Sequence, residues 1–175
     1  IASDDPVLYF EPKRRYHAKG DVDEEAALQD ARPMGTARVV APGADVTLVT
    51  YGGLVQLATD AALAAADEGV SVEVIDLRSL SPLDLDTVAA SVRKTGRLVV
   101  THEAALSGGL GAEISASITE RCFYYLEHAP VRITGHDIPY PPARLEAAHL
   151  PDLDRILDGI DRAMDRPNSL SGVDD

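Results

Sequence analysis

Short apolar runs alternate with amphipathic stretches along most of the chain. Five runs rich in β-branched and other apolar residues have the length of buried strands: 36–40, 46–50, 70–77, 97–101 and 131–134. Four other stretches carry apolar residues at helical spacing: 54–68, 82–94, 111–124 and around 153–160. This alternation predicts an α/β fold, a three-layer sandwich with a mostly parallel, roughly five-stranded sheet covered on both faces.

Glycine, proline and aspartate punctuate these elements. Gly69 follows the first helical stretch, where a left-handed cap is expected. The run 81–84 (SPLD) predicts a helix start, with Ser81 as the cap and Asp84 beside the first free N–H groups. Residues 102–109 are expected to form a loop, and the proline-rich segment 139–142 is expected to be extended.

The two ends of the chain lack the alternating pattern. Residues 1–35 are predicted to be an entry segment with an acidic linker, since 18–35 are polar and include Asp21, Asp23, Glu24 and Glu25. Residues 166–175 are predicted to be a flexible tail. One domain is expected over 36–165, because 175 residues with 45% hydrophobic content suffice for one sizeable core.

The charge of the chain limits its partners. With 29 acidic and 16 basic residues the formal net charge is −13, which repels nucleic acid and anionic membrane surfaces and favours a basic protein partner. No apolar run is long enough to cross a bilayer. The single cysteine, Cys122, excludes an internal disulfide and is expected to be a buried apolar group.

The segment from His102 to Gly111 is the most suggestive for chemistry. It joins a predicted strand to a predicted helix, where free N–H groups can hold an anion. It fails as a dinucleotide fingerprint because Ile114 stands at the third glycine position, and as a zinc-protease motif because position 106 is Leu106. We therefore favour a tight turn with glycines for close packing, with phosphate binding as the alternative.

The remaining chemistry-bearing residues form no recognisable set. The histidines are scattered, without metal-ligand spacing: His17, His102, His128, His136 and His149. No nucleophile elbow surrounds the serines, and no nucleophile, base and orienting group can be combined. We therefore predict no catalytic, cofactor-binding or metal-binding residue in this chain.

Ordered blocks of sequence resemble a known family. They are 5–16 (DPVLYFEPKRRY), 43–50 (GADVTLVT), 74–78 (VIDLR) with Pro82, 94–104 (KTGRLVVTHEA), Gly108-Gly109, 112–114 (AEI) and Asp137-x-Pro139-x-Pro141. Together they resemble the β subunit of the thiamine-diphosphate-dependent 2-oxoacid dehydrogenase E1 component. Residues 102–104 (HEA), 120–123 (ERCF) and 126–127 (LE) are more similar to the branched-chain enzyme than to the pyruvate enzyme. The resemblance implies a transketolase-like carboxy-terminal domain.

The resemblance also implies where the chemistry lies. In the family an earlier domain of the β subunit and the α subunit hold thiamine diphosphate with Mg, so an isolated carboxy-terminal domain is expected to lack the active site and to be inactive. The implied partners are the α subunit and a second β subunit, in a heterotetramer of two α and two β subunits, and the subunit-binding domain of the E2 lipoyl acyltransferase. The implied location is the bacterial cytoplasm, with the mitochondrial matrix as the alternative.

These partners suggest a set of interface residues. We predict partner contacts for six: His102, Glu103, Asp152, Asp154, Asp158 and Asp161. The four aspartates lie in or next to the expected final helix, and an acidic surface there would steer a basic docking domain. A solvated helix face is the alternative for these aspartates. For the whole chain, the alternatives are the β subunit of pyruvate dehydrogenase and a non-catalytic protein-docking module.

Overall fold

The computed structural model describes residues 4–19, 21, 23, 25 and 33–166. By its internal contacts the chain divides into two units, Ile1–Arg32 and Pro33–Asp175. In the first unit the described part holds the short 3-10 helix η1 (Lys13–Arg15) after the exposed side chains of Leu8, Tyr9 and Phe10. The predicted tail lies outside the described residues except for Arg166. Glu24 of the acidic linker also lies outside them. The predicted domain limits, 36 and 165, stay predictions.

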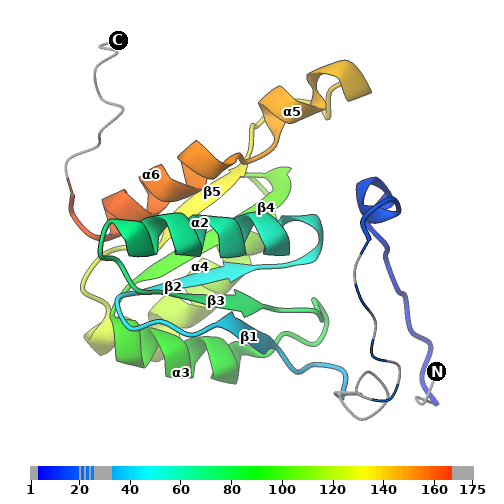
Figure 1. The fold of residues 1–175 in the computed structure, drawn as a ribbon. Coiled ribbons are helices and arrows are strands. Elements are labelled where there is room, and N and C mark those ends of the chain that lie inside the picture. Colours follow the sequence, from blue (N-terminus) through cyan, green and yellow to red (C-terminus); the bar gives the residue numbers. More distant parts are fainter. Residues whose placement is uncertain (1–3, 20, 22, 24, 26–32, 167–175) are drawn as a thin grey trace. The chain divides into compact units, whose positions relative to one another are not determined.

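The second unit is built on one sheet. Its strands in the described part are β1 (Arg38–Ala41), β2 (Val46–Thr50), β3 (Val72–Asp76), β4 (Leu98–Ala105) and β5 (Val131–Gly135), in the order β1-β3-β2-β4-β5 (Figure 1). Only β1 runs antiparallel to its neighbour; the other pairs are parallel. The prediction of a mostly parallel, five-stranded sheet is confirmed.

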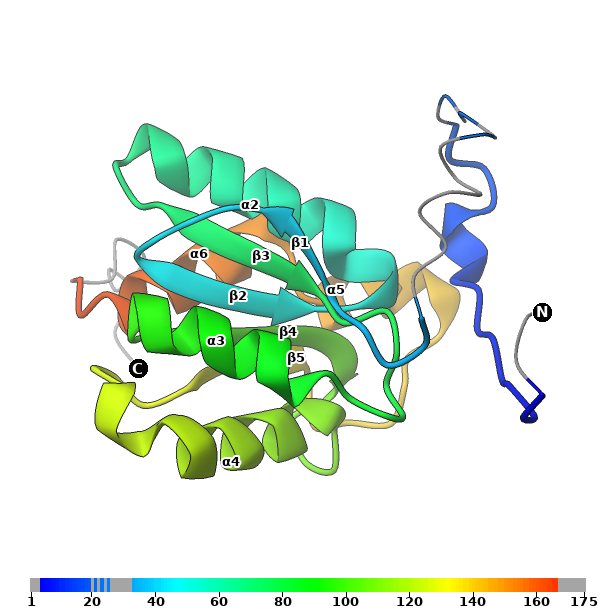
Figure 2. The same ribbon diagram turned by 90° about the horizontal axis from the view of Figure 1, so that it is seen from below.

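Helices cover both faces of this sheet. The longer ones are α2 (Val55–Asp67), α3 (Leu85–Thr95), α4 (Leu110–Cys122) and α6 (Leu153–Ala163). Four shorter helical segments join them: η2 (Gly52–Leu54), η3 (Phe123–Tyr125), η4 (Ala143–Leu145) and α5 (Glu146–His149). Helices α2 and α6 lie on one face, and α3 and α4 on the other (Figures 1 and 2). The predicted three-layer sandwich is therefore confirmed. No helix in the described residues is long and apolar enough to cross a membrane.

Each face of the sheet has its own apolar core. Strand β2 contributes to both cores, because Leu48 packs towards α2 and α6 while Val49 packs towards α3 and α4. The α2 side is lined by alanines at helical spacing, which let the helix approach the sheet closely. Cys122 belongs to the other core and is fully buried, as expected.

Two element boundaries differ from the predictions. Helix α3 is capped by Asp84, whose side chain accepts a hydrogen bond from the Thr87 N–H, and not by Ser81. Strand β4 continues to Ala105 where a loop is predicted, because it stays paired with β5 through His102 and, after an irregularity, at Ala105. The helical segments η4 and α5 follow the prolines and have no counterpart in the predicted elements.

Candidate functional site

The carboxyl ends of β2 and β4 form the first candidate site. The chain leaves β2 for β3 on one side and later returns to β4 on the other, and ligands of open α/β sheets bind at such a switch point. Tyr51 follows β2, and its ring stacks on that of His102 in β4, with centroids 6.1 Å apart. These two rings therefore fill the position where a ligand would be expected.

The ring of His102 is fully engaged within the chain. It is 1% exposed, and its Nε2 accepts a hydrogen bond of 3.0 Å from the Gly111 N–H at the start of α4. Nδ1 must then carry the proton, which it donates to the Ala104 carbonyl at 3.1 Å. Burial, supported by the positive charge of Arg132, lowers the pKa of His102, although the bond to Ala104 opposes this. His102 is thus a neutral ring that caps a helix N-terminus.

The two glycines of this loop make room for that ring. A Cβ on Gly111 would lie 2.5 Å from His102 Nε2, and a Cβ on Gly109 would lie 2.3 Å from the Ala105 carbonyl oxygen. The favoured interpretation, a tight turn for close packing, is therefore confirmed. Because the imidazole takes the Gly111 amide and the space above it, this helix start does not fit a diphosphate. His102 is 1% exposed in this chain, and its predicted contact with a partner stays a prediction.

Beside this site, Tyr51 is held as a neutral phenol. Burial, and then the negative charge of Glu103, raises the pKa of Tyr51. Glu103 itself is half-buried, one residue beyond His102. The predicted contact of Glu103 with a partner stays a prediction.

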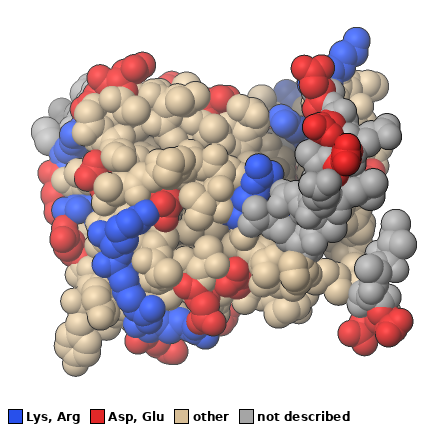
Figure 3. Space-filling model, turned by 60° about the horizontal axis from the view of Figure 1, so that its bottom comes forward, with Lys and Arg blue, Asp and Glu red and all other residues tan. Residues whose placement is uncertain are grey.

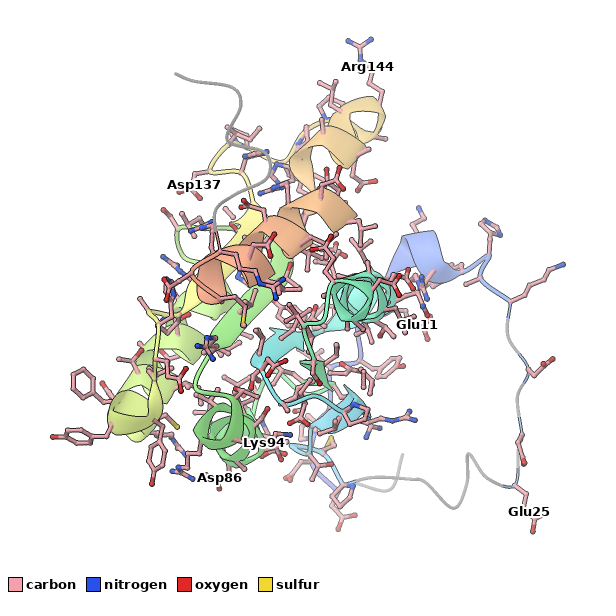
Figure 4. The ribbon with its side chains drawn as sticks, turned by 60° about the vertical axis from the view of Figure 1, so that its left-hand side comes forward. Glu11, Glu25, Asp86, Lys94, Asp137 and Arg144 are labelled. Carbon is pink, nitrogen blue, oxygen red and sulfur yellow. The ribbon has the colours of Figure 1, made fainter. Side chains whose placement is uncertain are left out.

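A pocket of about 290 Å³ opens at the end of β5, between the loop after β4 and helix α6. Two hydrogen bonds to Asp137, from the Ser107 N–H (2.8 Å) and hydroxyl (2.6 Å), fix that loop, and Arg132 donates to the Leu106 carbonyl at 3.2 Å. Figure 4 labels Asp137 beyond the end of the yellow strand β5. Hydrogen bonds from the Ser107 hydroxyl and backbone N–H lower the pKa of Asp137, so it stays ionised. One wall of the pocket is therefore fastened at several points.

Helix α6 supplies the opposite wall with charged side chains. Arg155 donates from Nη2 to the Thr134 carbonyl at 2.6 Å, which ties α6 to the end of β5. Arg162 lies 3.8 Å from the Asp158 carboxylate. Arg155, Asp158 and Arg162 all line the pocket. Sequence reasoning missed this cluster, because only the contact between α6 and β5 brings Arg132 close to Arg155 and Arg162.

A shallow groove of about 180 Å³ lies on the other side of α6, against the end of α2. It is lined by four acidic residues, of which three were predicted as interface residues: Glu68, Asp154, Asp158 and Asp161. No Lys or Arg of the described residues lines it. Asp152 is separate: its side chain caps α6 by accepting from the Arg155 N–H. We name Glu68, Asp154, Asp158 and Asp161 the acidic groove.

One face of the molecule carries mixed surface charge. On the face seen in Figure 3, acidic and basic side chains are interspersed among uncharged ones. The acidic groove is thus a local concentration of negative charge. Within the described part of the chain, no three His, Cys, Asp or Glu side chains are placed to hold a metal ion.

The fold agrees with a family match. Residues 35–156 match the family described as transketolase, C-terminal domain, and the chain belongs to that family. A solved structure described as "Split gene transketolase, inactive beta4 tetramer" is similar at a TM-score of 0.66 and 29% sequence identity, over 78% of this chain and 44% of the other.

Curated relatives are more similar in sequence. The chain is 52% identical over 168 residues to the "3-methyl-2-oxobutanoate dehydrogenase subunit beta" of Mycobacterium tuberculosis, which covers 95% of this chain and 47% of the relative. It is 49% identical over 164 residues to the "Pyruvate dehydrogenase E1 component subunit beta" of Leifsonia xyli subsp. xyli, which covers 94% of this chain and 48% of the relative. The chain thus spans about half the length of the curated relatives it matches.

Proposed function

We propose that this chain is the carboxy-terminal domain of the β subunit of a branched-chain 2-oxoacid dehydrogenase, and that it serves subunit assembly and docking of the E2 acyltransferase. The observation that carries the proposal is the 52% identity over 168 residues to a 3-methyl-2-oxobutanoate dehydrogenase β subunit. The shared transketolase C-terminal fold supports it.

In this proposal the chemistry takes place outside the described residues. Thiamine diphosphate, when bound, supplies the electron sink for decarboxylation of the 2-oxoacid. The helix start at Gly111 is filled by His102 and does not receive the diphosphate. This chain's own residues therefore position subunits and partners, and none is given a catalytic role.

Exposed aromatic side chains support the assembly role. Phe123, Tyr124 and Tyr125 at the end of α4 are 65%, 95% and 53% exposed. Large aromatic residues that are exposed together on a monomer are typical of protein interfaces. Contact with the α subunit or with a second β subunit would remove them from water.

The acidic groove supports the docking role. Its carboxylates lie together on α6 and at the end of α2, without a basic residue of the described chain among the lining. A basic domain would be attracted to this surface, which raises the association rate and sets its orientation. We assign the subunit-binding domain of the acyltransferase to this groove.

The second candidate is the β subunit of pyruvate dehydrogenase. It is favoured by the 49% identity to the pyruvate dehydrogenase β subunit of Leifsonia xyli subsp. xyli. The two candidates share the fold and the kinds of partner subunit, and they differ in the 2-oxoacid. The substrate must therefore be tested by turnover.

The test is turnover by the full-length protein assembled with its α subunit. We expect kcat/KM for 2-oxoisovalerate (3-methyl-2-oxobutanoate) to exceed that for pyruvate. The opposite order would establish the pyruvate candidate. If neither acid is decarboxylated by an assembly with bound thiamine diphosphate, the chain is a docking module and the proposal is overturned.

A further inference from the structure

The pocket between β5 and α6 has an unmatched charge. Arg162 lies 3.8 Å from Asp158, and the charge of Arg132 adds to the lowering of the Asp137 pKa by the hydrogen bonds from Ser107. No carboxylate lies within ion-pair distance of Arg155 in the described part of the chain, although this arginine is half-buried. A half-buried guanidinium without a counter-ion is costly, and a bound anion would offset that cost.

The same pocket has one unmet donor and one unmet acceptor. Arg155 Nη1 is buried and donates no hydrogen bond to the described residues, and Asp158 Oδ1 is buried and accepts none. Both side chains line the pocket, three positions apart on one face of α6. A ligand that satisfies both atoms must present an acceptor next to a donor.

We propose that this pocket binds a small 2-amino acid. The carboxylate of the ligand accepts from Arg155 Nη1, and its ammonium group donates to Asp158 Oδ1. The side chain of the ligand lies towards Leu106 and Ile133, the apolar residues of the lining. The volume of about 290 Å³ is at the small end of ligand pockets, which suits a ligand of this size.

A simple anion fits the pocket less well. Phosphate would accept hydrogen bonds from Arg155 but would also face the Asp158 carboxylate, which repels it. Asp158 Oδ1 would then still lack a hydrogen-bond donor. The net charge of the lining is modest, because Asp137 and Asp158 stand against Arg132, Arg155 and Arg162. A zwitterion matches this mixture of charges, and its two charged groups meet opposite partners.

The test is isothermal titration calorimetry on the full-length protein, with L-alanine, L-valine and L-leucine as probes. Two analogues of valine remove one group each: 3-methylbutanoate lacks the ammonium, and isobutylamine lacks the carboxylate. We expect saturable binding of at least one amino acid, and about 10- to 100-fold weaker binding of both analogues, because each loses a charge-assisted hydrogen bond. Inorganic phosphate is the probe for a simple anion site.

Variants locate the binding. Arg155→Gln and Asp158→Asn should each weaken amino-acid binding about 10- to 100-fold, whereas Arg121→Gln, a surface arginine paired with Asp86 on α3, should not. Asp158→Asn leaves the bond between Arg155 and Thr134 in place, so it keeps the test valid if Arg155→Gln fails to fold. Absence of binding at millimolar amino acid, binding unchanged in Asp158→Asn, or phosphate binding as tight as the amino acid would overturn the proposal.

Discussion

At the residue scale, the space around His102 leaves no room for a methyl group on Gly111. Gly111→Ala would normally favour a helix, since glycine is the poorer helix former. Here the added Cβ would meet His102 Nε2 at 2.5 Å, inside a fully packed site. We expect the free energy of unfolding to fall by about 1–3 kcal/mol, as for other overpacked cores.

Urea denaturation followed by circular dichroism measures this change. Glu120→Ala is the matched control, because Glu120 is exposed on the same helix and should change stability little. A Gly111→Ala protein as stable as the control would show that the ring of His102 is not packed against this glycine.

The protonation of His102 should make stability depend on pH. Its pKa is lowered in the folded chain, first by burial, so the unfolded chain binds the proton at a higher pH. Stability is therefore full above the unfolded pKa of about 6.5 and falls as the pH drops from there towards the lowered folded pKa. The loss of stability at low pH should be smaller in His102→Gln.

The measurement is the free energy of unfolding of the wild-type chain and of two variants between pH 7.5 and pH 5. His17→Gln serves as the control, since His17 is exposed. The slope of His17→Gln should equal that of the wild type. An equally steep slope in His102→Gln would contradict the assignment of a buried neutral ring.

At the element scale, Asp84 joins two elements that are distant in sequence. Its carboxylate caps α3 through the Thr87 N–H at 3.0 Å and accepts from the Ala37 N–H at 2.9 Å, just before β1. Burial alone would raise the pKa of Asp84, but these bonds and that of the Thr87 hydroxyl lower it. Asp84→Ala should therefore cost about 1–2 kcal/mol, at the upper end for a lost cap.

Asp86→Ala is the matched control for this prediction. Asp86 lies in the first turn of the same helix and pairs with Arg121, but its side chain is 93% exposed. An exposed ion pair contributes little, so thermal melting should change much less than in Asp84→Ala. Equal shifts in the two variants would contradict the capping and tethering role of Asp84.

The elements also show how far the sequence predicts this fold. The alternating pattern predicts the five strands and four long helices, because buried strands and amphipathic helices have distinct periods. It does not predict that β4 continues through His102 to Ala105, since that extension depends on pairing with β5. Nor does it choose Asp84 over Ser81 as the cap, and it does not reveal that Asp84 also accepts a hydrogen bond from the distant Ala37 N–H.

At the scale of the whole molecule, the candidate sites were predicted only in part. Three of the acidic-groove residues were expected from the final helix, since their spacing alone places them near one another. Glu68 was missed because α2 reaches α6 only in the folded chain. The guanidinium of Arg155 was missed for the same reason: its partner is the Thr134 carbonyl on β5.

Docking at the acidic groove should depend on ionic strength. We expect the triple variant Glu68→Gln/Asp154→Asn/Asp161→Asn to weaken binding of the acyltransferase subunit-binding domain about tenfold and to flatten its salt dependence, because exposed charges are screened over about 8–10 Å. Asp158 is left intact because it also lines the other pocket. Surface plasmon resonance from 50 to 500 mM salt measures both effects.

The control for docking removes the same charge elsewhere. Asp86→Asn/Glu113→Gln/Glu120→Gln neutralises three acidic residues of α3 and α4, on the opposite face of the sheet. It should bind as the wild type does. Equal weakening of binding by both triple variants would show that the net charge of the chain, and not the acidic groove, determines the affinity. An affinity that does not change with salt would contradict the docking role of the groove.

We propose that this domain belongs to a β subunit which assembles with an α subunit. The native mass of the full-length protein co-expressed with its α subunit, measured by native mass spectrometry, tests it most directly. We expect a complex of two α and two β subunits. A protein that stays free of the α subunit at micromolar concentration would contradict it.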